Sequence, residues 1–165
     1  MEVDGSNYLY ALATVSVTFV GFSALLLLFR QTIGGRMTGY DGYFMLSFMQ
    51  AGFIVTGGAL LPQLLAFFGL PPALLWRAAS AVMAVPILLF VVTTPWRRRR
   101  AAPGPVPAYV WLLLLLQFLA ALYLLVNALG NEPRLAPFAL ALTAILFTTA
   151  VAYLIALSRA LAGPD

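Results

Sequence analysis

The chain has 165 residues, of which 63% are hydrophobic and 8% are charged, and all nine of its basic residues are arginine, for a formal net charge of +4. A soluble domain typically carries about 25% charged residues, so a soluble fold of this length would lack the polar groups that cover a water-facing surface. The chain contains no Cys, His or Lys, which excludes disulfides, the commonest metal ligands and a lysine Schiff base. We therefore expect a protein that lies mostly in lipid and holds no metal and no other cofactor.

Five long apolar segments follow one another along the chain, at residues 8–29, 43–68, 74–94, 108–129 and 137–157. Each has about 20–26 residues, which is enough to cross a bilayer as a helix. Only a helix satisfies its own backbone groups in such a run, and the alternation of a membrane β-barrel is absent. Glycine and proline mark the connections, none of which is long enough to hold a soluble domain. The sequence predicts an all-α fold, in which a bundle of five transmembrane helices forms a single polytopic domain over residues 1–165.

The distribution of arginine predicts the orientation of this bundle. If the N-terminus lies outside, seven arginines lie on the inner side and only Arg77 and Arg134 lie outside, whereas the opposite orientation reverses these numbers. Loops on the cytoplasmic side of a membrane carry an excess of Arg and Lys. The acidic N-terminal residues Glu2 and Asp4 agree with this choice, because that end must cross. We therefore expect a multi-pass protein of a bacterial inner membrane with the orientation N-out/C-in.

No charged group lies in the middle of any apolar segment. Proton-coupled transporters and membrane enzymes usually need ionisable groups within the membrane. Here the acidic residues lie near the termini or in connections, at Glu2, Asp4, Asp41, Glu132 and Asp165. We therefore expect the protein not to be an enzyme.

The second apolar segment is the most irregular of the five. Pro62 has no N–H for the carbonyl of Gly58 and its ring clashes with that carbonyl, beside a pair of glycines near the middle of the segment. Broken helices of this kind can expose backbone oxygens to an ion or substrate. Close packing around a proline kink is the alternative interpretation. The candidates in this segment for lining a pore or facing a ligand are Gly52, Thr56, Gly57, Gly58 and Gln63.

A similar stripe of small and hydroxyl residues follows the first segment. Thr14 and Thr18 share one helical face, and Ser16 and Ser23 share another. Such faces let helices approach closely and hydrogen bond to one another, so we expect the first segment to pack against the second through them. If several copies assemble around an axis, Thr14 and Thr18 become further candidates for lining a pore.

Arginines near the ends of the third segment are candidates for contacts at the membrane surface. Four of them directly follow the segment and are candidates for contact with anionic lipid headgroups, namely Arg97, Arg98, Arg99 and Arg100. A topological role alone also explains this run, and we expect no nucleic acid partner. Arg77 lies near the other end, where it is a candidate for the outer mouth of a pore or a partner of Glu132.

Two functions agree with these features. The first is an oligomeric ion channel or pore, because polar but uncharged stripes follow the first two segments. The second is a non-catalytic accessory or structural subunit of a larger membrane assembly, because packing also explains every polar position. The expected partners are the lipid bilayer and a second copy or another membrane protein, with an inorganic ion in the case of a channel.

Overall fold

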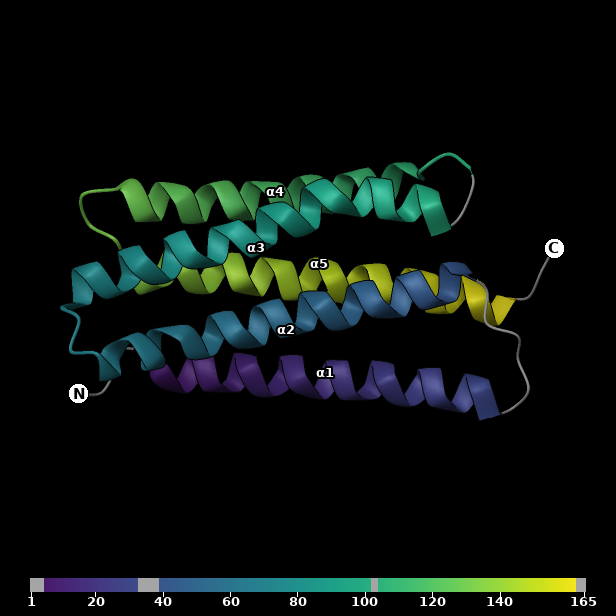
Figure 1. Cartoon of the computed structure of the whole chain (residues 1–165), viewed down its shortest axis with the longest axis horizontal. Helices are drawn as coiled ribbons and strands as arrows, with labels where there is room; N and C mark the ends of the chain where they lie inside the picture. Colours follow the sequence, from purple (N-terminus) through teal and green to yellow (C-terminus); the bar gives the residue numbers. More distant parts are fainter. Residues whose placement is uncertain (1–4, 33–38, 102–103, 163–165) are drawn as a thin grey trace.

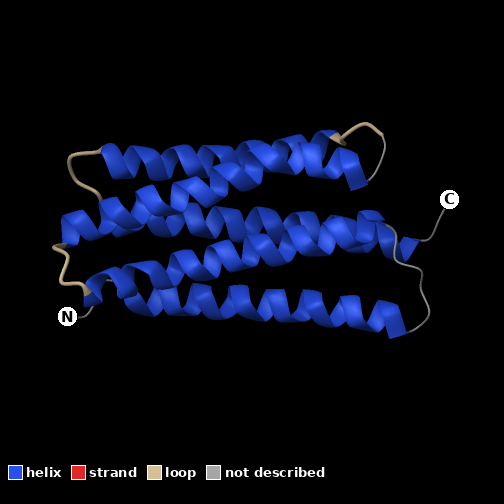
Figure 2. Cartoon of the chain, viewed as in Figure 1, coloured by secondary structure: helices blue, strands red, loops and turns tan. Residues whose placement is uncertain are grey.

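The computed structural model describes residues 5–32, 39–101 and 104–162, and all of the regular structure in these residues is helical (Figure 2). Arg36 and the acidic residues Glu2, Asp4 and Asp165 lie outside the described residues. The five helices are α1 (Ser6–Thr32), α2 (Gly39–Phe67), α3 (Pro72–Ala101), α4 (Ala108–Leu129) and α5 (Leu135–Ala162). Each of them is long and apolar enough to cross a membrane. The prediction of an all-α fold with five such helices is therefore confirmed.

The helices extend beyond most of the predicted segments. The largest difference is in α3, which continues past Thr94 through the four arginines to Ala101. Arginine forms helix readily in water, so an apolar run can end while the helix continues. Hydropathy therefore located the apolar part of each helix and underestimated its length.

Successive helices run in opposite directions, with α1 and α4 at opposite edges of the bundle and α3, α5 and α2 between them (Figure 1). Helix α2 contacts α1, α3 and α5, whereas α4 contacts α3 and α5. We call the end where α3 and α5 finish the arginine end, and the end where α1 starts the N-terminal end. Helix α1 packs chiefly against α2, so much of the surface of α1 is exposed.

Small side chains fill the contacts between helices. Alanine recurs where helices cross, with exposed fractions of 0–1% at Ala51, Ala59, Ala79, Ala84 and Ala121. Larger residues, among them Phe138 and Leu142, are also fully buried beside them. Small residues bring two helical backbones close together, which is the usual basis of packing when lipid rather than water surrounds a bundle.

The closest approach of α1 to α2 is at Gly52. The hydroxyl of the fully buried Ser16 donates a hydrogen bond of 2.8 Å to the carbonyl oxygen of Gly52. A Cβ atom at Gly52 would lie 2.2 Å from Cγ2 of Val20, which is too close for any side chain. The prediction that α1 packs against α2 is thus confirmed for the face of Ser16.

Helix α2 continues through Pro62, so the irregularity predicted from Gly57, Gly58 and Pro62 does not interrupt the helix. Pro62 is fully buried. In the orientation that satisfies both of its amide atoms, Gln63 donates to the carbonyl oxygens of Ala59 at 2.8 Å and Leu60 at 3.1 Å. Neighbouring polar groups commonly pair backbone atoms around a proline in this way.

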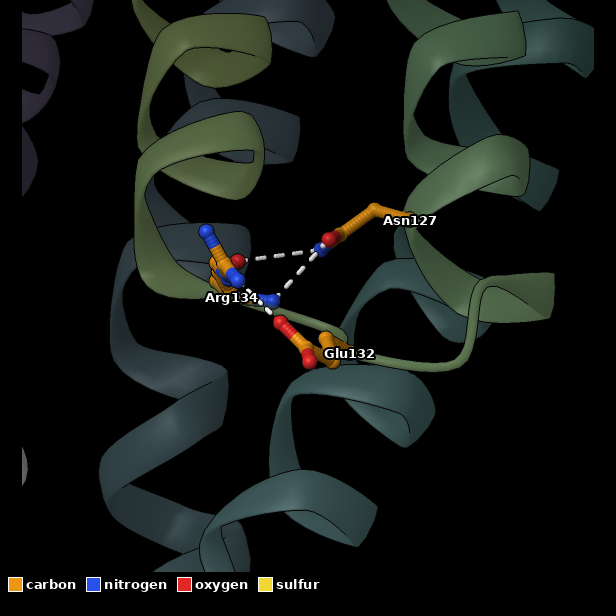
Figure 3. Close-up of polar contacts among 3 residues, drawn as sticks. All are labelled: Asn127, Glu132 and Arg134. Carbon is orange, nitrogen blue, oxygen red and sulfur yellow. Dashed lines mark hydrogen bonds and ion pairs between the residues drawn. The ribbon is translucent and has the colours of Figure 1, made fainter.

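A polar cluster joins α4 to α5 at the N-terminal end (Figure 3). The buried Asn127 amide donates to Ser80 Oγ at 2.8 Å and to the carbonyl oxygen of Arg134 at 3.0 Å, and it accepts the Arg134 N–H at 3.0 Å. Glu132 forms an ion pair with the Arg134 guanidinium. Arg77 instead donates to the carbonyl oxygen of Gly130 at 3.0 Å, so the predicted pairing of Arg77 with Glu132 is wrong.

We predict opposite effects of leucine at two glycines of α2. Gly52→Leu should lower the stability of the protein by about 1–3 kcal/mol or more, because the new side chain collides with Val20. Gly57→Leu should leave stability unchanged or raise it, because Gly57 is exposed with nothing within 4 Å of a Cβ atom. Thermal unfolding in detergent measures both, and equal melting temperatures for the two variants would contradict the α1–α2 contact.

Candidate functional site

The two candidates on α1 lie on its outer surface. Thr14 and Thr18 are exposed, and their hydroxyls donate to the carbonyl oxygens of Tyr10 and Thr14 at 2.8 Å each. With Val15, they help to line an open, shallow depression on this helix. Their face therefore points away from α2, and only the other face, that of Ser16, makes the contact within the bundle.

The candidates on α2 point in different directions. Gly52 contacts α1, while a Cβ atom at Gly58 would lie 2.8 Å from Met83 of α3 and 2.9 Å from Leu142 of α5. Thr56 is half-buried and donates to the carbonyl oxygen of Gly52 at 2.9 Å. Gly57 is exposed, and the amide of Gln63 bonds its own helix as described above. These residues therefore do not share one surface within the chain.

Two of the four consecutive arginines turn back onto the bundle. The Nη1 atom of Arg97 donates to Oε1 of Gln50 at 2.6 Å, and its guanidinium lies 5.9 Å from the ring centroid of Tyr43. The guanidinium of Arg98 lies 5.9 Å from the ring centroid of Tyr40. These two arginines hold the end of α3 against the start of α2.

The other two arginines are exposed. Arg100 lies over the ring of Trp96, with its guanidinium carbon 3.6 Å from the ring centroid. Such an arrangement orients the cation and the aromatic ring together at the surface. Contact of Arg99 and Arg100 with anionic lipid stays a prediction.

A cavity of about 80 Å³ lies between α2, α3, α4 and α5 in the half of the bundle nearer the arginine end. Its walls are mostly aromatic and aliphatic, with polar groups at its two ends. Its lining includes Tyr40, Tyr43, Phe44, Phe48, Phe90, Arg98, Tyr109, Gln117, Thr148 and Thr149. We call it the inner cavity.

The deep end of the inner cavity is built from α4 and α5. Gln117 is 5% exposed, and its amide nitrogen donates to Oγ1 of Thr148 at 3.1 Å and of Thr149 at 3.3 Å. Both threonine hydroxyls donate in turn to carbonyl oxygens of their own helix, including that of Ile145. The Oε1 atom of Gln117 is buried and has no hydrogen-bond partner.

The other end of the inner cavity, which we call its mouth, lies where α2 and α4 begin and α3 ends. Arg98 lines it beside Tyr40 and Tyr109. Its Nη1 atom makes a long contact of 3.4 Å with the carbonyl oxygen of Pro105, and its Nε atom is buried without a partner. Glu132, the one carboxylate whose side chain the structure describes, pairs with Arg134 and not with Arg98.

The sequence pattern did not predict the inner cavity, because residues far apart on four helices line it. The one available signal was that Gln117, Thr148 and Thr149 are isolated polar residues within apolar segments. Hydropathy gives the depth of these residues along the apolar segments but not the rotation of each helix about its own axis.

No protein-family model, no curated protein and no solved structure matches this chain.

Proposed function

We propose that the chain is a multi-pass protein of a bacterial inner membrane, N-out/C-in, and that it acts as a non-catalytic subunit of a larger membrane assembly. The observation that carries this proposal is that the polar groups of α2 bond within the chain or pack against other helices. Gly52 accepts from Ser16 and from Thr56, and Gln63 bonds its own helix. Packing thus accounts for the features that otherwise favour a pore.

Exposed apolar surface supports residence in a membrane. Only 33–39% of the residues in the most apolar stretch of each helix are buried. Large side chains such as Phe67, Phe68 and Leu129 are 88%, 75% and 85% exposed. A soluble monomer rarely exposes contiguous apolar patches of more than a few hundred Å². The arginine run at one end of the bundle supports the cytoplasmic placement of that end.

The composition supports a non-catalytic role. His and Cys, which carry much of catalytic acid–base, nucleophilic and metal chemistry, are absent from the sequence. The one acidic side chain among those that the structure describes, Glu132, forms an ion pair with Arg134. Neither the residue composition nor this carboxylate therefore supplies a nucleophile paired with a general base.

The exposed face of α1 is the surface through which we expect association with a second copy of the chain. This helix lies at the edge of the bundle, and Thr14 and Thr18 lie on its outer side. Each hydroxyl donates within the helix but keeps a lone pair that can accept a bond from a neighbour. Their small volume also permits the close approach that favours helix pairs in lipid.

Cysteine cross-linking tests this association, because the chain has no cysteine of its own. Thr18→Cys should give a cross-linked dimer in native membranes, whereas Leu119→Cys should not. Both positions are exposed and lie near the middle of their helices, but Leu119 is on α4 at the opposite edge. Absence of any cross-linked product at position 18, or equal products at both positions, would contradict assembly through α1.

An oligomeric ion channel is the second candidate, favoured by the outward placement of Thr14, Thr18 and Gly57. In such a channel these residues would face an axis shared by several copies. Gly57→Leu is a clean probe because it should fold normally. If the channel exists, purified protein in liposomes should conduct ions and Gly57→Leu or Thr18→Leu should change the conductance. A complete lack of conductance would exclude this function.

A further inference from the structure

The deep end of the inner cavity presents a hydrogen-bond acceptor without a donor. Thr148 and Thr149 give their hydroxyl protons to backbone carbonyls, so they can only accept from Gln117. This fixes the amide with its nitrogen toward the threonines and leaves Oε1 unpartnered. A buried amide oxygen without a bond is costly, so an occupant should bring a donor to this point.

The mouth of the same cavity presents the opposite chemistry. The guanidinium of Arg98 is a cation, and its Nε–H is buried with no acceptor. Carboxylates are the natural partners of such a group because they accept charge-assisted hydrogen bonds. An occupant should therefore carry an anion at the mouth and a donor at the deep end.

The space between the two ends is mostly apolar. Ser47 and Thr94 also line it, and their hydroxyls donate to carbonyl oxygens of their own helices. On α4 the lining runs from Tyr109 to Gln117, eight residues along the helix, which corresponds to about 12 Å. Its walls include Phe44, Phe48 and Phe90. Spread over this length, a volume of about 80 Å³ leaves a narrow space, which a slim chain follows better than a ring does, with its anion at the mouth.

We propose that the inner cavity binds an amphipathic monoanion with a slim, unbranched body and a hydroxyl at the end remote from its carboxylate. The hydroxyl donates to Oε1 of Gln117, the chain lies between the aromatic walls, and the carboxylate pairs with Arg98. A simple fatty acid matches the mouth and the walls but places a methyl group against the unpartnered oxygen. Water can donate to Gln117 and accept from Arg98, but it makes no apolar contact with the walls. This site is independent of the assembly through α1.

Binding to the whole protein in nanodiscs of neutral lipid tests the site. Labelled omega-hydroxyoctanoate is equilibrated with wild-type nanodiscs and with empty nanodiscs, and unlabelled octanoate competes with it. Octanoate is the more apolar of the two and partitions better into lipid, so a preference for the hydroxylated acid cannot come from hydrophobicity. We expect saturable binding to the protein and about tenfold weaker competition by octanoate, since the buried oxygen loses its donor.

Three variants locate the bound molecule. Gln117→Met, which has nearly the same shape as the wild type, should abolish the preference for the hydroxylated acid. Arg98→Gln should weaken binding about tenfold, whereas Arg99→Gln, which changes an exposed neighbour that does not line the cavity, should leave it unchanged. Absence of saturable binding, or equal affinity for octanoate and its hydroxylated form in the wild-type protein, would overturn the proposal and leave water as the occupant. The comparison of the two acids needs no variant, so it stands even if a substitution impairs folding.

Discussion

A polar group in apolar surroundings must find its partner within the chain, and the arrangement of the five helices depends on this constraint. Most serine and threonine hydroxyls of the described spans donate to a carbonyl of their own helix, as Thr56 does to Gly52. Longer polar side chains instead join two helices, as Gln50 does through Arg97 and Asn127 does through Ser80. Each such bond fixes the rotation of a helix that an apolar contact alone would leave less defined.

The same constraint distinguishes the contact between α1 and α2 from the inner cavity. On α1 and α2, the groups that face the bundle are paired, and the contact of Ser16 with Gly52 joins the helices where a glycine leaves room. In the inner cavity, the pairing is incomplete, because the threonines beside Gln117 have no proton left to give to its oxygen. Packing is therefore the simpler account of the first region, and ligand binding is the account that the second favours.

The sequence was sufficient for the number, type and approximate position of the helices, since lipid-length apolar runs permit little else. It was not sufficient to predict which face of each helix is buried in the bundle. Thr14 and Ser16 are two residues apart and chemically alike, yet Thr14 is exposed and Ser16 is fully buried. Gly57 and Gly58 are adjacent, yet only Gly58 packs against other helices. These differences arise from the rotation of each helix about its axis, which depends on contacts between helices distant in the sequence. The inner cavity was unpredictable for the same reason.

The central proposal is that these helices cross a membrane five times, with the arginine end in the cytoplasm. The constraint on polar groups applies in full only inside a membrane. Labelling of single cysteines by a membrane-impermeant maleimide in intact spheroplasts tests the proposal most directly. Asn131→Cys and Ala108→Cys place exposed thiols in or beside connections at opposite ends of the bundle. The account predicts that position 131 is labelled in intact spheroplasts and that position 108 is labelled only after permeabilisation. Equal labelling of both positions in intact spheroplasts, or the reverse order, would contradict it.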